Sequence, residues 1–159
     1  LFINEHCKNA MNLTDFVDNV KISLEDLEYT TQHGYAKGIS NIFIKQLEDI
    51  PVTKRPIHCS DKKRMQFYVK DSDEWKKDEK HENMDKAIDK ISGKQFSRLK
   101  EWEKMHPDFL TNEKLTKIYL ELCNMAGVAV DDPATNKNIK KQISNSVKLN
   151  KEDMKNEII

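Results

Sequence analysis

Glycine, proline and cysteine are all scarce in this sequence of 159 residues, which has four glycines, four prolines and three cysteines. So little glycine and proline excludes collagen-like and low-complexity linker classes and favours long regular elements, chiefly helices. Cys7, Cys59 and Cys123 are far apart and form no C-x-x-C pair, so neither a disulfide framework nor a four-cysteine zinc site is expected. This cysteine usage fits a reducing, intracellular compartment best.

Net charge and long apolar runs are also missing. The 27 basic and 27 acidic side chains cancel, which removes the global basic excess of proteins that coat nucleic acid unaided. No stretch approaches the roughly 18 uninterrupted apolar residues of a membrane span. Leu1, Phe2 and Ile3 are too few for the apolar core of a signal peptide. We therefore expect no membrane partner.

Charge that is even overall is uneven along the chain. Residues 1–53 carry four basic and eight acidic groups, residues 54–106 carry fifteen and eleven, and residues 107–159 carry eight of each. The balanced sum therefore hides an acidic first third and a basic middle. Such an arrangement suits pairing of one copy's front with another copy's middle.

The beginning of the chain predicts short helices. Apolar residues from Phe2 to Met11 recur at helical spacing, and Thr14 can cap a second helix. Ser23 followed by Asp26 indicates a capping box that opens a third helix.

A fourth short helix is expected next. Gly34 lies just past the end of the third helix, and Gly38 and Ser40 precede the apolar residues of the fourth. Pro51 ends this helix because proline lacks the backbone N–H group that a helix interior requires.

The apolar period changes to two after Pro51. Met65, Phe67 and Val69 alternate with more polar residues, which is typical of a half-buried strand. We expect a β-hairpin here, with a possible third short strand around Trp75. A two-stranded hairpin is marginal alone, so it must pack on helices or on a second copy of itself.

Helical spacing returns over residues 78–106, with Gly93 in the middle. This segment is either one long helix that tolerates the glycine, at a cost of roughly 1 kcal/mol, or two helices that meet there. Two more helices are expected. The first starts at Thr111 or Asn112 and is capped at its end by Gly127. The second has Asp132 as its N-cap and Pro133 as its first residue.

These patterns predict an α+β fold that is predominantly helical, with six to eight helices and one central β-hairpin or small antiparallel sheet. We expect a single globular domain over residues 1–149. Its parts are a helical subregion, the β-hairpin and a second helical subregion, over residues 1–53, 54–78 and 79–149. Residues 150–159 are expected to form a loosely ordered tail.

The segment from Lys54 to Arg64 concentrates the side chains most suggestive of chemistry. If the protein is an enzyme, His58, Cys59 and Asp61 are the candidates for the centre of a metal-dependent nuclease or a Cys-His hydrolase. Adjacent residues on a strand point to opposite faces, however, so His58 and Cys59 cannot both reach one ion without distortion. No recognised ligand spacing occurs, and we predict no metal and no cofactor. A buried, small apolar side chain is the simpler interpretation of Cys59.

The same segment carries five cations that could contact nucleic-acid phosphates from a hairpin and its turn: Lys54, Arg55, Lys62, Lys63 and Arg64. The alternative is a solvated turn in which Asp61 caps the local backbone and pairs with a neighbouring lysine. Both interpretations stay open from the sequence.

Several stretches resemble a domain repeated in proteins of giant nucleocytoplasmic DNA viruses: residues 2–12, 38–44, 54–64 and 68–71 with Trp75, Trp102 and residues 125–127. The Arg-Pro-Ile-His-Cys-Ser-Asp core is the most specific part, whereas residues 65–67 depart from the family's usual acidic and aliphatic run. In that family the domain commonly ends a longer protein, often behind a two-Cys, two-His zinc finger, which would explain a chain that starts at Leu1. The resemblance implies a viral, DNA-linked context in the host cytoplasm (a viral factory) or the virion, and brings no known activity.

The sequence therefore predicts a noncatalytic accessory or oligomerisation module of a viral nucleic-acid-associated protein. This hypothesis depends on the lack of a convincing active site, on a hairpin that needs a cover, and on the resemblance. The expected partners are a second copy or another viral protein, with nucleic acid at the basic hairpin turn. The alternative is a metal-dependent nuclease or Cys-His hydrolase centred on His58, Cys59 and Asp61.

Overall fold

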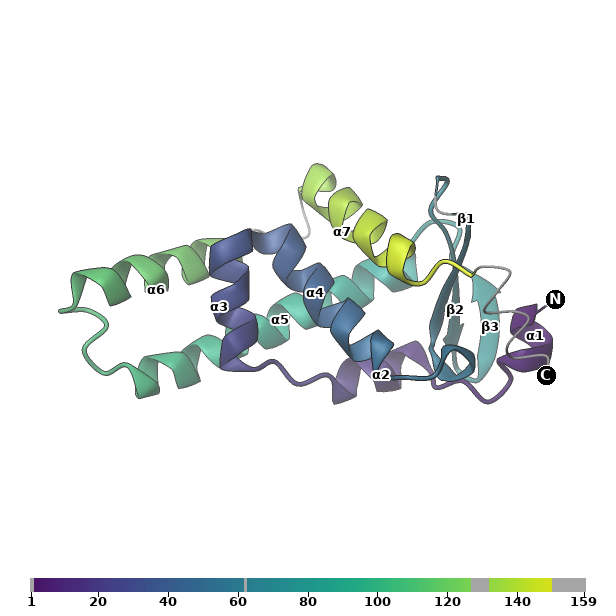
Figure 1. Cartoon of the computed structure of the whole chain (residues 1–159), viewed down its shortest axis with the longest axis horizontal. Coiled ribbons are helices and arrows are strands. Elements are labelled where there is room, and N and C mark those ends of the chain that lie inside the picture. Colours follow the sequence, from purple (N-terminus) through teal and green to yellow (C-terminus); the bar gives the residue numbers. More distant parts are fainter. Residues whose placement is uncertain (1, 62, 127–131, 150–159) are drawn as a thin grey trace.

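The computed structural model describes residues 2–61, 63–126 and 132–149 (Figure 1). These residues form seven α-helices, a 3₁₀ turn (Val52–Lys54) and three antiparallel strands in the order β1-β2-β3. The bounds are α1 (Phe2–His6), α2 (Leu13–Asn19), α3 (Leu24–His33), α4 (Tyr35–Glu48), β1 (Ile57–Asp61), β2 (Gln66–Asp71), β3 (Glu74–Lys77), α5 (Glu82–Met105), α6 (Glu113–Ala126) and α7 (Pro133–Ser146). The predicted α+β, predominantly helical fold is confirmed, and so is the third strand around Trp75.

The long helix α5 sets the length of the molecule. The sheet lies at one end, and α3, α4 and α6 are arranged along α5 away from it (Figure 1). Helix α7 packs on α4, and α6 packs on α3 and on the far end of α5. Helix α1 lies on the side of the sheet that faces away from the other helices (Figure 1).

The inner face of the sheet joins the helices in one core. Ile57 and Cys59 on β1 and Phe67 and Val69 on β2 are each fully buried and belong to the same hydrophobic cluster as the inner residues of α4, α5 and α7. Because side chains alternate along a strand, the residues between them point to the outer face. The expected alternation of β2 is therefore confirmed, and the hairpin packs on helices within one chain.

One edge of the sheet and the turn between β2 and β3 are each fixed by specific local geometry. Beyond α7, the Leu149 N–H donates to the Cys59 carbonyl and the Cys59 N–H donates to the Val147 carbonyl, so the free edge of β1 is paired. Ser72 and Asp73 both have positive φ, as a tight two-residue hairpin turn requires. The register of the small sheet is thus fixed at the turn and at the edge.

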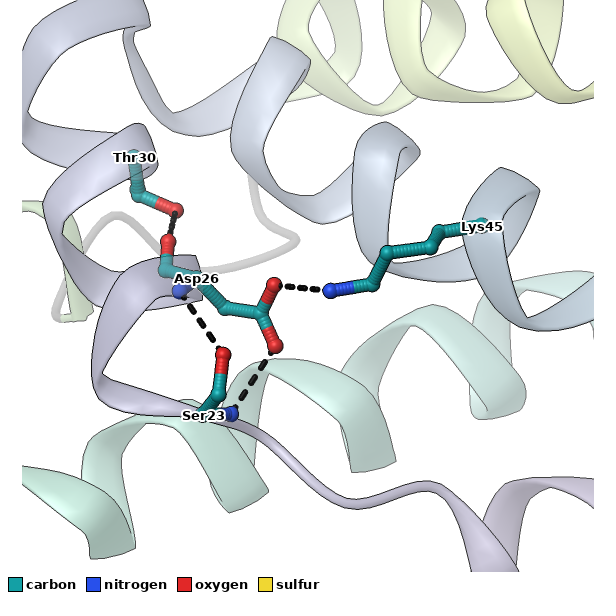
Figure 2. Close-up of polar contacts among 4 residues, drawn as sticks. All are labelled: Ser23, Asp26, Thr30 and Lys45. Carbon is teal, nitrogen blue, oxygen red and sulfur yellow. Dashed lines mark hydrogen bonds and ion pairs between the residues drawn. The ribbon is translucent and has the colours of Figure 1, made fainter.

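An ion pair joins α4 to the capping box at the start of α3 (Figure 2). Ser23 and Asp26 form the predicted reciprocal cap, and the buried Asp26 carboxylate also pairs with Lys45 of α4. Thr30 lies against Gly38, where an added Cβ would overlap the threonine hydroxyl. This close approach lets α4 cross α3 at Gly38.

The expected start of the fourth helix is wrong. Gly38 and Ser40 lie inside α4, which begins at Tyr35, directly after Gly34 with its φ of 93°. The physical reason is that Gly34 alone breaks the chain direction, whereas Gly38 is needed for packing and Ser40 donates its hydroxyl to the Ala36 carbonyl within the helix.

The bounds of the first two helices differ from those that the apolar spacing and the expected cap suggest. Helix α1 ends at His6, so the periodic residues that follow it are not helical. Asn12, rather than Thr14, is the N-cap residue of α2, and Thr14 instead donates to the Asp71 carboxylate on β2. Tertiary hydrogen bonds to the sheet override the local signals here.

The segment around Gly93 is one continuous helix. Helix α5 runs for 24 residues through Gly93, and the buried Asp78 carboxylate accepts hydrogen bonds from the Asn83 and Met84 N–H groups at its start. Later, Asp132 caps α7 with Pro133 in its first turn, as predicted. The boundary expected at Gly127, and the tail at residues 150–159, lie outside the described residues.

The two helical glycines should respond oppositely to alanine. We expect Gly93→Ala to raise the free energy of unfolding by up to about 1 kcal/mol, because its Cβ meets nothing within 4 Å and alanine is the better helix former. Gly38→Ala should lower it by about 1–3 kcal/mol, because the methyl group must displace Thr30. Urea denaturation of both variants measures the difference, and equal effects would contradict the close approach of α3 and α4.

Candidate functional site

The outer face of the sheet is covered by the N-terminal segment. Lys70 of β2 is almost fully buried, and its ammonium group donates to the Lys8 and Ala10 carbonyls at 2.8 and 2.7 Å. The indole N–H of Trp75 on β3 donates to the Cys7 carbonyl at 2.8 Å. The three carbonyl groups that accept these hydrogen bonds follow the end of α1 and take no part in helical hydrogen bonding. The bonds therefore fix the segment after α1 across the sheet.

His58 lies beneath this cover. Its Nε2 atom is 3.7 Å from the Cys7 Sγ atom, and its ring centroid is 5.6 Å from that of Trp75. Burial, reinforced by the nearby Arg55 guanidinium, lowers the pKa of His58 from its usual 6.5 to about 4, although a hydrogen bond to the Val52 backbone opposes the shift. The imidazole is therefore neutral at pH 7 and closed off from solvent.

Cys59 points to the opposite face. Its thiol lies in the hydrophobic core, where burial raises its pKa. A buried thiol with a raised pKa is a poor nucleophile, because the thiolate is the reactive form. The structure thus separates His58 from Cys59 by the thickness of the sheet, and the simpler interpretation of Cys59 as a core side chain describes its surroundings.

Asp61 is occupied in shaping the turn. The pairing register of β1 and β2 shifts between Cys59 and Asp61. The Asp61 carboxylate accepts hydrogen bonds from the backbone N–H groups of Lys63 and Arg64. The Arg64 side chain pairs with it at 3.7 Å. These contacts match the predicted capping role, with arginine in place of lysine as the ion-pair partner. His58, Cys59 and Asp61 thus do not converge on one site.

The four described cations among the five singled out for phosphate contact do not form one patch. Lys54 and Arg55 precede β1, and the Arg55 Nε–H group donates to the Ile50 carbonyl. Lys63 and Arg64 lie beyond the other end of β1, which is about 17 Å long for its five residues. Lys62 lies outside the described residues. The turn itself therefore offers two described cations, one of them paired with Asp61.

Sequence reasoning missed Cys7, Lys70 and Trp75 as a structural unit. A lysine on the alternate positions of a strand normally indicates a solvent-facing side, so nothing local marks Lys70 as buried. The alternation did place Tyr68 and Lys70 on the same face. Only the path of the N-terminal segment, which no periodicity encodes, decides that this face is covered.

No group of three or more histidine, cysteine, aspartate or glutamate side chains that could hold a metal ion occurs among residues 2–61, 63–126 and 132–149. No helix in those ranges is long and apolar enough to cross a membrane.

Several hollows lie in the surface of the described residues. One of about 320 Å³ lies beside α1 on the outer face of the sheet, lined by Phe2, Tyr68 and Trp75 among others. A second, of about 680 Å³, lies between α3, α5 and α6. A third, of about 780 Å³, follows the contact between α5 and the segment after α2.

The pKa of His58 makes stability depend on pH. Because the folded pKa is about 4 and the usual value is 6.5, the unfolded chain binds the proton first as the pH falls. The contribution of His58 is present above pH 6.5 and should be lost between pH 6.5 and 4, by about 3 kcal/mol in total. Urea denaturation at several pH values should show a smaller loss for His58→Gln. His33→Gln, which removes an exposed histidine, is the control and should keep the full loss.

Thiol reactivity checks the burial of the cysteines. Cys7 and Cys59 are buried and Cys123 is partly exposed, so we expect one fast-reacting thiol in the native protein and three in denaturant. Cys123→Ser should remove the fast reaction, measured with a chromogenic disulfide reagent. Fast labelling of Cys7 or Cys59 would show that one of these thiols is accessible, as a Cys-His hydrolase would require.

Comparisons with protein-family models, with curated proteins and with solved structures found no match to this chain. The resemblance to the giant-virus domain therefore stays a prediction. The function has to be argued from the surfaces of the molecule.

Proposed function

We propose that this chain is a noncatalytic interaction module that self-associates through the end of the molecule formed by residues 99–126, here called the helical arm. The arm comprises the last turns of α5, the loop after it and α6 (Figure 1). The observation that carries the proposal is the concentration of exposed apolar side chains on this arm.

The arm is poorly buried for its composition. Of the four large hydrophobic residues that are exposed in the described chain, Met105, Leu110 and Leu120 belong to the arm, at 62, 71 and 54% exposure. In α6, every side chain whose burial is described is partly or fully exposed, including Leu115 and Ile118. Exposed apolar residues that are concentrated in one part of a molecule typically mark a protein interaction surface.

The interior of the arm is nevertheless well ordered by aromatic packing. Trp102 stacks on His106 with ring centroids 4.4 Å apart, and Phe109 packs against Tyr119 at 4.5 Å. These rings brace the loop between the two helices. The arm can thus present a fixed surface, so association does not require ordering it first.

The hollow beside α6 suits a second copy of the same chain. Leu115 and Ile118 line it together with Trp102, and its charged lining residues are Glu28, Glu121, Lys114 and Lys117. Two acidic and two basic groups around an apolar floor are self-complementary, so a two-fold pair can place the lysines of each copy against the glutamates of the other. A net charge of zero also leaves no overall repulsion between copies.

The wider setting is also proposed rather than derived from these contacts. The resemblance of residues 2–12 and 54–64 supports a viral, nucleic-acid-associated protein, in the host cytoplasm or the virion, in which a separate zinc finger recognises DNA. The role of this chain is then to join copies of that protein. A viral protein partner in place of a second copy is the alternative, and it would apply if the protein stays monomeric in the experiment below.

Light scattering over a concentration series tests self-association. We expect a dimer whose population rises with concentration, and at least about tenfold weaker dimerisation for Leu110→Lys with Leu120→Lys, since two desolvated charges would enter the interface. Both side chains are exposed, so the fold should be retained.

Phe96→Lys provides the matched control. Phe96 is 53% exposed on α5 but precedes residues 99–126, so this variant removes a comparable apolar side chain from outside the helical arm. Dimerisation should be unaffected. A protein that stays monomeric at every concentration overturns self-association, and so does equal weakening by the control variant.

A further inference from the structure

Four cations follow one another along α5 at intervals of four residues: Lys86, Lys90, Lys94 and Arg98. Residues four apart lie on one ridge of a helix, and twelve residues rise by about 18 Å. We call this ridge the cation row. It lies on the side of α5 that faces α2 and the segment after it, because Lys94 donates to the Asp18 and Val20 carbonyls.

Two acidic side chains in the first half of α5 occupy a different side. Asp85 pairs with Lys140 of α7 at 3.2 Å, and Asp89 acts electrostatically on Tyr35 of α4. Asp85 and Asp89 are therefore directed toward α7 and α4, whereas the cation row faces α2. Glu101 is the acid of α5 that lies on the side of the row. Net charge computed over the whole chain conceals this separation.

Most of the row has no carboxylate partner. Within the described part of the chain, no carboxylate lies within 4 Å of the Lys86, Lys90 or Lys94 amino group, and the same holds for Lys21 across the groove. Lys94 is held by two neutral carbonyls, which position its charge without cancelling it. Only Arg98 is paired, with Glu101, and its Nε atom is buried with no hydrogen-bond partner.

The row borders two hollows that share Lys90. The larger, of about 780 Å³, also contains Lys21, Lys94 and Arg98, with Asp18 and Glu101 as its acids. The smaller, of about 250 Å³, contains Lys86 and one acid, Asp71, which already accepts a hydrogen bond from Thr14. Five cations therefore face three carboxylates, two of which are occupied.

Gly93 leaves the floor of the larger hollow open. It lines the hollow between Lys90 and Lys94, and a Cβ built at this position meets nothing within 4 Å. A mid-helix glycine lowers helix stability relative to alanine, and here it provides space beside the unpaired cations.

We infer that the groove along the cation row binds the phosphodiester backbone of a nucleic acid. Phosphate oxygens replace the missing carboxylate partners of Lys21 and Lys90, and the 18 Å ridge allows several successive phosphates to be neutralised. Contacts of this kind carry no base specificity. The site lies on α5 rather than at the β1–β2 turn, and it does not depend on self-association through the helical arm.

Fluorescence anisotropy with labelled duplex and single-stranded oligonucleotides, over a range of salt concentrations, tests this site. We expect binding of at least one of the two forms, with affinity that falls steeply with salt. Lys21→Glu with Lys90→Glu should weaken binding by about tenfold or more at low salt and reduce the salt slope by roughly two. Both lysines are exposed and unpaired, so the fold should be retained.

Two further variants separate this groove from general electrostatics. Lys63→Glu with Arg64→Glu makes the same charge change at the β1–β2 turn and should leave affinity and slope nearly unchanged. Gly93→Glu removes no cation but places a carboxylate on the groove floor, and should weaken binding by a smaller factor. Equal loss in both double variants overturns the assignment, as does binding to vesicles containing anionic lipid without binding to either oligonucleotide, or no binding at all. Light scattering of the same variants reports dimerisation separately, so failure here is distinguishable from failure of the proposed function.

Discussion

The cover over the outer face of the sheet depends on one buried ammonium group. An isolated buried charge is costly, and backbone carbonyls outside a helix need donors. The Lys70 ammonium group donates to the Lys8 and Ala10 carbonyls, so the buried charge and the two carbonyl groups gain their hydrogen-bond partners together. Once the N-terminal segment is held there, Cys7 lies against His58 and the imidazole loses its access to water. The lowered pKa of His58 is thus a consequence of packing rather than evidence of catalysis.

Local signals in the sequence predicted much of the fold, because their physical causes are local. The Ser23 capping box, the alternation of β2 and the Asp132 cap each involve residues within a few positions of one another. The start of α4 and the cover over the sheet could not be predicted in this way. The role of Gly38 depends on the close approach of Thr30. The burial of Lys70 depends on carbonyl groups about sixty residues away in the sequence.

The candidate site shows the same division. Strand alternation was enough to separate His58 from Cys59, and turn chemistry was enough to give Asp61 a capping role. The sequence pattern could not show that the cations of residues 54–64 lie at two ends of a strand. Nor did it select the row on α5, since lysines at four-residue spacing normally indicate only a solvated helix face. That these lysines have no carboxylate partner among the described residues can be seen only once the packing of α2 and α7 on α5 is known.

The two proposed surfaces would together explain how a chain without net charge could act in the proposed nucleic-acid setting. The helical arm and the cation row involve different parts of α5, so one copy can use both at once. Four to five cations give weak, salt-sensitive phosphate binding when they act alone. A two-fold pair carries two rows, and the second row then binds at the high effective concentration set by the first. Self-association would therefore strengthen phosphate binding without any excess of positive charge, provided that both rows of the pair can reach the same strand or duplex.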